Sequence, residues 1–229
     1  MKDTTTWKVL RRLVLPVYVP MTAEALGIGM LIPVLPLYLR EEGLSFSVVS
    51  VVLAAAGLGS MIGGLPAGSL LARLDEKTVL IAALIAMAIS TALLGLTEAV
   101  AGLVVFRFVF GVGTIGLRLS RQTYVSNAVR STERGRAMSM IGGSFRLALL
   151  VGPAFGGYLV DQIGFTATFV VCGAVNGIGL IGAAPSGRAR AAGCDLSQQP
   201  QVGLWAALWS YRALLFKGGL VPALVVAVR

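Results

Sequence analysis

The sequence predicts an all-α integral membrane protein with six transmembrane helices and the start of a seventh. Apolar residues make up 56% of the 229 residues and charged residues only 13%, whereas soluble domains contain roughly 25% charged residues. The apolar residues suffice for six helices of about 20 residues, the length that crosses a bilayer. This composition excludes a water-soluble globular domain.

Six apolar segments long enough to span a membrane follow one another along the chain. They lie at residues 13–38, 46–71, 78–97, 99–124, 137–160 and 165–184. The first segment is too long for a signal-peptide core, contains four prolines and lacks a small-residue cleavage site, so it is not a cleavable signal peptide. We therefore expect one six-helix bundle over residues 1–184.

The distribution of charge predicts the orientation of this bundle. Lys and Arg are concentrated before the first segment, in the even-numbered loops and after the sixth segment, whereas the odd-numbered loops are acidic or balanced. By the positive-inside rule, both ends of the bundle lie in the cytoplasm and the protein is integral to the inner or plasma membrane. The net charge of +9 forms no basic stripe with interleaved aromatic residues, which argues against nucleic acid as a partner.

The chain changes character after residue 184. Residues 185–201 are rich in Pro, Ser, Gly and Arg, and we expect a cytoplasmic linker there. Residues 202–229 open with an amphipathic stretch carrying two Trp and one Tyr, which predicts a helix lying at the membrane interface. The remaining apolar residues, about half a span, predict the truncated start of a seventh transmembrane helix.

Several kinds of chemistry lack the residues that they require. The chain contains no His, and its only cysteines are Cys172 and Cys194. This composition argues against His-based catalysis, a disulfide framework and the usual zinc sites. No Ser–Lys pair at a shared depth and no carboxylate pair is present, so we expect no enzyme activity, no metal and no cofactor.

A short segment recurs at the ends of the second and fifth apolar segments. Residues 68–75 read GSLLARLD and residues 157–164 read GYLVDQIG. Because an odd number of spans separates the two copies, they run in opposite directions across the membrane. An inverted repeat of three plus three helices is typical of secondary transporters.

Ionisable residues inside the apolar segments are the candidate functional residues. Glu24, Arg107 and Arg146 lie about 13 to 18 Å from the nearest charged segment end at 1.5 Å per residue. Charges at such depth are unfavourable unless they pair or face water, so we expect them to face the bundle interior. An alternative role for Glu24 is a structural ion pair with Arg107.

The fourth apolar segment carries a stripe of arginines. Arg107, Gly111, Arg118 and Arg121 fall within about 80° of one another on a helix, which predicts one wall of a water-filled cavity. Alternatively, Arg118 and Arg121 only extend to the membrane surface. The glycine pairs at 59/63, 64/68, 152/156 and 173/177 predict close helix packing.

Four motifs together resemble the major facilitator superfamily, specifically its drug:proton antiporter branch. They are RxxxGxG at 107–113, GPxxGG at Gly152, Pro153, Gly156 and Gly157, GSLLARLDEK at 68–77, and PVLPLY at 33–38. The resemblance covers nearly the whole chain, as the amino-terminal half of a twelve-span transporter with the start of the seventh span. GPxxGG is the most specific of the four.

The loop motif departs from the family pattern, which is close to GxLaDRxGRK. Gly68, Leu70, Arg73 and Lys77 match that pattern, whereas its Asp, Gly and following Arg are replaced here by Ala72, Asp75 and Glu76. In the family this loop gates the inward side.

The resemblance implies half of a major facilitator fold and proton-coupled efflux of a small molecule. Glu24 would carry the proton, and Arg107 would tune the proton affinity of Glu24 or relay the proton. Arg146, Arg118 and Arg121 would line the cavity, and an excess of arginine admits an anionic substrate.

Two alternatives to this function stay open. One is a non-transporting, truncated or degenerate membrane module that needs a separate carboxy-terminal half, favoured by the end at Arg229 and the altered loop. The other is a metabolite symporter or uniporter.

Overall fold

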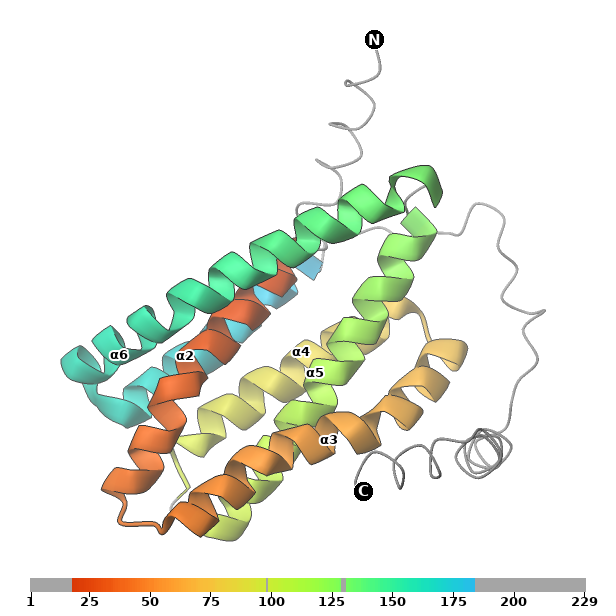
Figure 1. The fold of residues 1–229 in the computed structure, drawn as a ribbon. Helices are drawn as coiled ribbons and strands as arrows, with labels where there is room; N and C mark the ends of the chain where they lie inside the picture. Colours follow the sequence, from red (N-terminus) through yellow and green to blue (C-terminus); the bar gives the residue numbers. More distant parts are fainter. Residues whose placement is uncertain (1–17, 98, 129–130, 184–229) are drawn as a thin grey trace, which may run out of the picture. The chain divides into compact units, whose positions relative to one another are not determined.

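The structure, a computed structural model, describes residues 18–97, 99–128 and 131–183, which fall within one compact unit, Met1–Ala192. This part of the chain is helical (Figure 1). Its five helices are α2 (Val19–Glu41), α3 (Phe46–Arg73), α4 (Glu76–Leu94), α5 (Val100–Ala128) and α6 (Ser131–Ala183). All five are long and apolar enough to cross a membrane, which confirms the all-α membrane class. The predicted linker at 185–201 and the segment 202–229 lie outside the described residues.

Local chemistry accounts for the boundary between α2 and α3. Pro20 stands in the first turn of α2, where its missing N–H breaks no helical hydrogen bond. Gly43 has φ 75° in the turn after α2, a backbone conformation that glycine adopts readily. Ser45 then caps α3, because its side chain accepts a hydrogen bond from the backbone N–H of Val48 at 3.4 Å.

The longest helix, α6, is divided by one residue. Gly164 has φ 76° and ψ 175°, far from helical values, and only glycine takes this conformation without strain. We refer to residues 131–163 as the first limb and to residues 165–183 as the second limb. Figure 1 shows the chain turning back between them, where the sequence predicts the connection between the fifth and sixth spans.

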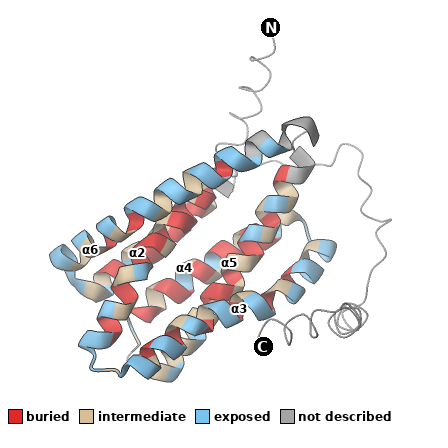
Figure 2. Ribbon diagram, viewed as in Figure 1, coloured by how far each residue is buried: buried red, intermediate tan, exposed pale blue. Residues whose placement is uncertain are grey.

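Helix α2 packs between the two limbs of α6. On the first limb, a Cβ placed on Gly152 would lie 2.6 Å from the Cα of Gly29. On the second limb, a Cβ placed on Gly27 would lie 2.6 Å from the Nδ2 of Asn176. These close approaches bury most of α2, as its colouring in Figure 2 shows.

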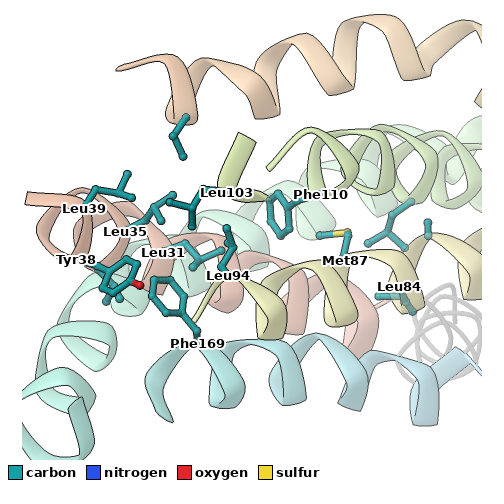
Figure 3. Close-up of a cluster of buried hydrophobic side chains, with 14 of the residues drawn as sticks. Leu31, Leu35, Tyr38, Leu39, Leu84, Met87, Leu94, Leu103, Phe110 and Phe169 are labelled. Carbon is teal, nitrogen blue, oxygen red and sulfur yellow. The ribbon is translucent and has the colours of Figure 1, made fainter. Parts of the chain in front are cut away.

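The remaining helices form a second group that α4 joins to the first. Helix α5 packs against both α3 and α4, and α4 also packs against α6. The apolar core that holds them together draws on α2, α3, α4, α5 and the second limb. Figure 3 labels several of its members, among them Leu31, Leu35, Leu84, Met87, Leu103, Phe110 and Phe169. Within it, the ring of Tyr38 stands edge-on to that of Phe169 at a centroid distance of 5.3 Å.

Large apolar side chains also lie on the outside of the helices. Met61 of α3 is 76% exposed and Leu150 of α6 is 75% exposed. A soluble monomer rarely exposes so many large apolar side chains, whereas lipid or a partner helix would cover them favourably.

The predicted glycine packing is confirmed in part. Gly59 and Gly63 pack against Phe108 and Val112 of α5, Gly152 and Gly156 against α2, and Gly173 against Ala88 and Ala92 of α4. The prediction is wrong for Gly68 and Gly177, because a Cβ on either would meet no neighbouring atom within 4 Å. A sequence pattern locates a helix face made of small residues, but the arrangement of the neighbouring helices determines which of these faces pack against another helix.

Candidate functional site

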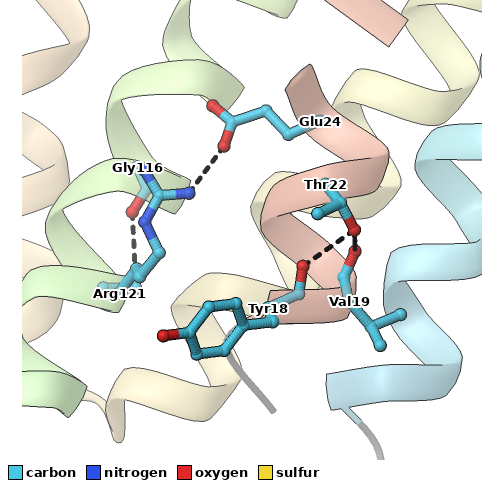
Figure 4. Close-up of polar contacts among 7 residues, drawn as sticks. Tyr18, Val19, Thr22, Glu24, Gly116 and Arg121 are labelled. Atoms are coloured by element: carbon cyan, nitrogen blue, oxygen red, sulfur yellow. Dashed lines mark hydrogen bonds and ion pairs between the residues drawn. The ribbon is translucent and has the colours of Figure 1, made fainter. Parts of the chain in front are cut away.

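Glu24 of α2 is a fully buried carboxylate with an arginine partner. Its Oε2 accepts a hydrogen bond and ion pair from Nη1 of Arg121, on α5, at 2.7 Å (Figure 4). Its Oε1 is buried and has no hydrogen-bond partner among the described residues. The carboxylate therefore has one oxygen held by a cation and one oxygen available to a further donor.

The ion pair bridges two helices that are not in close backbone contact. The close packing partners of α5 are α3 and α4, and that of α2 is α6. Glu24 and Arg121 have long side chains, which reach across the separation that Figure 4 shows. Breaking a buried ion pair on one side leaves an uncompensated charge and is strongly destabilising. The pair is therefore a direct link between α2 and α5.

Two further arginines lie close to this pair in height along the helices. Arg118 precedes Arg121 by about one turn of α5, is exposed and acts electrostatically on Glu24. Arg146 is exposed on the first limb of α6. Neither of them forms an ion pair with a carboxylate of the described residues.

A small apolar cluster shared by α2, α5 and the first limb gives a common reference level for the heights of these charged residues. Met21 of α2, Val125 of α5 and Ile141 of the first limb form one buried cluster, with Tyr18, Tyr124 and Phe145 packed against it. The first limb runs parallel to α2 and α5 runs antiparallel to it, as the contacts of Gly29 with Gly152 and of Glu24 with Arg121 show. Counted at 1.5 Å per residue, the acid and the three arginines (Glu24, Arg118, Arg121 and Arg146) lie about 5 to 11 Å from the cluster in one direction.

Arg107 does not join this group. It lies fourteen residues before Arg121 on α5, about 21 Å along the helix axis. The alternative of a structural ion pair between Glu24 and Arg107 is therefore wrong, since Glu24 pairs with Arg121. Its Nε and Nη1 are buried without a hydrogen-bond partner among the described residues, and its guanidinium lies 5.2 Å from the ring centre of Phe110. Such a contact partly compensates an arginine removed from water.

The arginine stripe of α5 is not one continuous open wall. Gly111 packs against the backbone of Ala56 and Ser60 on α3, so the part of the stripe near Arg107 is a helix contact. Only the part that carries Arg118 and Arg121 reaches the neighbourhood of Glu24. The predicted cavity wall is therefore wrong at Gly111.

The GPxxGG residues are placed at a helix contact. Gly152 and Gly156 pack against Gly29 and Met30 of α2, whereas a Cβ placed on Gly157 would meet no neighbouring atom within 4 Å. Pro153 stands inside the first limb. Two of the four motif residues thus set the distance between α2 and α6.

The loop motif residues lie at the junction of α3 and α4. Arg73 ends α3 and is exposed, Lys77 stands in the first turn of α4, and Gly68 lies in open space near the end of α3. This junction is on different helices from the Glu24 ion pair.

One polar residue of the α2–α6 contact completes the neighbourhood. Asn176 of the second limb is fully buried, and its Nδ2 donates to the backbone oxygen of Cys172 at 2.9 Å. Its Oδ1 has no partner among the described residues. The hydrogen bond that its Nδ2 donates stays within α6.

A comparison with family models identifies this helical membrane protein. The model of the Major Facilitator Superfamily matches residues 21–228. The chain belongs to this superfamily. Its members are membrane transporters, and the apolar helices of the described residues fit an integral membrane protein.

Curated relatives of the chain include drug-resistance proteins. The class C tetracycline resistance protein of Escherichia coli is 29% identical over 186 residues, which cover 80% of this chain and 44% of that protein. Multidrug resistance protein 2 of Bacillus subtilis is 28% identical over 134 residues, covering 58% of this chain and 34% of its own length. A quinolone resistance protein of Staphylococcus aureus is 25% identical over 136 residues, covering 59% and 35%. The chain thus spans less than half the length of these relatives.

Proposed function

We propose that the chain is the amino-terminal bundle of a secondary transporter that exports a small molecule in exchange for protons, with Glu24 as the proton carrier. The observation that carries the proposal is the buried Glu24, held by Arg121 at Oε2 and without a described partner at Oε1. An ionisable residue inside a membrane helix is by default a candidate functional site. The names of the curated relatives support export of a drug-like molecule.

Two opposing effects act on the charge of Glu24. Burial disfavours a charged carboxylate, and a nearby guanidinium favours it. The group therefore has two accessible states: charged and paired with Arg121, or protonated at Oε1. A substrate that donates a hydrogen bond to Oε1 competes with the proton for that atom, and such competition is the basis of exchange.

Protonation of Glu24 also changes how the helices are held. A neutral carboxylic acid binds a guanidinium more weakly than a carboxylate does, so proton binding loosens the link between α2 and α5. Alternating access requires an element whose arrangement depends on what is bound. The ion pair connects the proton to helix arrangement, and Arg121, rather than Arg107, is the residue that tunes Glu24.

The proposed bundle has six spans in an inverted repeat of three plus three. The two limbs of α6 on either side of Gly164 count as the fifth and sixth spans, and the shorter, residues 165–183, is about 28 Å long at 1.5 Å per residue. The repeated segments at 68–75 and 157–164 both fall at the end of a helix or limb. The charge distribution of the loops supports an orientation with both ends of the bundle in the cytoplasm.

The test is proton-driven export in everted vesicles from cells that make this chain together with the second half of the class C tetracycline resistance relative. We expect Glu24→Gln to abolish acceleration of export by the proton gradient. Glu41→Gln is the matched control, because Glu41 is an exposed carboxylate at the other end of α2, and it should export normally. Gradient-driven export that persists in Glu24→Gln would show that Glu24 is not the proton carrier.

A further inference from the structure

The charges around Glu24 do not balance. Glu24 contributes one negative charge and Arg121 cancels it through the 2.7 Å ion pair. Arg118 and Arg146 add two positive charges at nearly the same height, and neither has a carboxylate partner among the described residues. The face formed by α2, α5 and the first limb therefore carries two surplus positive charges.

The surplus arginines are accessible whereas the acid is not. Arg118 and Arg146 are exposed, and Glu24 is fully buried. An exposed arginine in a membrane helix is favourable only where it faces water, a lipid headgroup or an anionic ligand. Guanidinium groups bind carboxylates and phosphates through charge-assisted hydrogen bonds. This face consequently attracts an anionic group and repels a molecule that is only cationic.

The free oxygen of Glu24 adds a second recognition element. Oε1 can only accept a hydrogen bond while the carboxylate is charged, and it has no described donor. Oε1 is buried in this arrangement of the helices. A ligand whose anionic group lies on Arg118 and Arg146 would complete the site if it displaced the side chains that cover Oε1 and directed an N–H or O–H donor at it. Such a donor occupies the atom at which the proton binds.

We infer that the substrate is amphoteric: a small molecule that carries an anionic group, bound by Arg118 and Arg146, together with a hydrogen-bond donor that binds Oε1 of Glu24. The inference rests on the proposed transport function and names the substrate class of that same site. The donor explains why an anionic substrate leaves in exchange for a proton. Without it, the negative charge of the substrate would favour proton binding to Glu24 and the two would bind together.

The experiment measures binding of two dyes to the purified chain in nanodiscs of phosphatidylcholine. The first is an aminoxanthene dye with a free carboxylate and ring N–H donors, and the second is its methyl ester, which keeps the donors and loses the anion. We expect the free acid to bind at least about tenfold more tightly than the ester, because a charged hydrogen bond is replaced by none. Equal binding, tighter binding of the ester, or no binding of either dye overturns the inference.

Single variants test whether Arg118 and Arg146 bind the carboxylate of the dye. Arg118→Gln and Arg146→Gln should each weaken binding of the free acid by about tenfold and leave the ester unchanged. Arg40→Gln is the matched control, because it removes one exposed arginine at the opposite end of α2 and should bind like the unchanged chain. All three side chains are exposed, and helix content measured by circular dichroism verifies that the variants fold. Loss of binding in the control as large as in the two variants overturns the inference.

Two further measurements, one with an anionic lipid and one at lower pH, distinguish substrate binding from lipid binding and test the proton exchange. Discs containing anionic phosphatidylglycerol test whether the arginines hold a lipid headgroup; if this lipid abolishes the arginine-dependent binding of the dye, the substrate inference is overturned. Acidification tests the proposed proton exchange, since a proton on Oε1 should weaken dye binding in the unchanged chain but not in Glu24→Gln. Binding that depends on the carboxylate and both arginines but not on pH would refute proton exchange at Glu24 and leave the substrate class intact.

Discussion

Arg121 decides whether the negative charge of Glu24 can remain buried. Replacing Arg121 by Gln leaves the carboxylate without its cation, and we predict a loss of about 3 kcal/mol in the free energy of unfolding. The loss should grow as the pH rises, because an unpaired carboxylate is readily buried only in its protonated form. Unfolding in mixed detergent–SDS micelles, followed by circular dichroism at several pH values, measures it.

The double variant Glu24→Gln with Arg121→Gln is the control for this prediction. It removes both charges, so it should recover most of the lost stability and remove the pH dependence. If Arg121→Gln alone unfolds like the unchanged chain at every pH, the ion pair does not hold α2 to α5.

The sequence predicts which residues carry charge into the bundle but not how they pair. Glu24 is recognisable because it is an acid within an apolar segment. Its partner depends on the relative height of antiparallel helices: α2 begins at the end of the bundle where α5 finishes, so a residue early in α2 faces one late in α5. Depths counted from the nearest loop charge on opposite sides of the membrane place both Glu24 and Arg107 near mid-depth, because such counts do not fix the height of one helix against another.

At the scale of helices, two glycines of one motif should respond differently to the same change. A methyl group on Gly152 would meet the backbone of Gly29 at 2.6 Å, whereas one on Gly157 would meet nothing within 4 Å. We predict that Gly152→Ala lowers the free energy of unfolding by about 1–3 kcal/mol through overpacking. Gly157→Ala should be neutral or slightly stabilising, because alanine favours a helix.

The same unfolding assay compares the two variants, with Gly157→Ala as the matched control. Equal stability of Gly152→Ala and Gly157→Ala would mean that α2 and the first limb are not in backbone contact at this height. The comparison also separates helix packing from other roles of the GPxxGG motif. If Gly157→Ala impaired transport without loss of stability, the defect would not arise from overpacking between helices.

Helix boundaries were predictable wherever local chemistry marks them. Segments expected at 46–71 and 78–97 correspond to Phe46–Arg73 and Glu76–Leu94, because Ser45 caps the former and charged residues separate the two. The connection between the expected segments 137–160 and 165–184 is shorter than the four residues that the apolar pattern leaves between them. Helical geometry continues up to Gly164 and resumes directly after it, since a single glycine with positive φ suffices to turn the chain.

At the scale of the whole molecule, the composition alone establishes the membrane class, but the arrangement of helices needs the structure. Nothing in the apolar pattern says that α2 lies between two limbs of one long helix. That arrangement follows from complementary contacts, such as Gly29 with Gly152 and Gly27 with Asn176, whose partners are far apart in sequence. Long-range pairing of this kind depends on shapes that one segment does not reveal.

The charged face around Glu24 also determines what these 229 residues do on their own. Exposed Arg118 and Arg146 are unfavourable in contact with lipid, and transport by alternating access needs a second bundle that moves against the first. Pairing two copies through this face would bring four unpaired arginines together, and like charges repel. We therefore predict that a different bundle, such as a separate carboxy-terminal half, is the better partner.

We accordingly predict that these 229 residues, purified and reconstituted alone in liposomes, fold into helices but show no saturable substrate flux when a proton gradient is imposed. Co-reconstitution with the second half of the class C tetracycline resistance relative should produce flux that Glu24→Gln abolishes, because only then does the proton site lie between two bundles. Circular dichroism of the lone chain distinguishes a folded, inactive bundle from an unfolded one. Saturable flux from the lone chain that disappears in Glu24→Gln would mean instead that copies of this bundle assemble into a working transporter, and that the surplus arginines are accommodated at their interface.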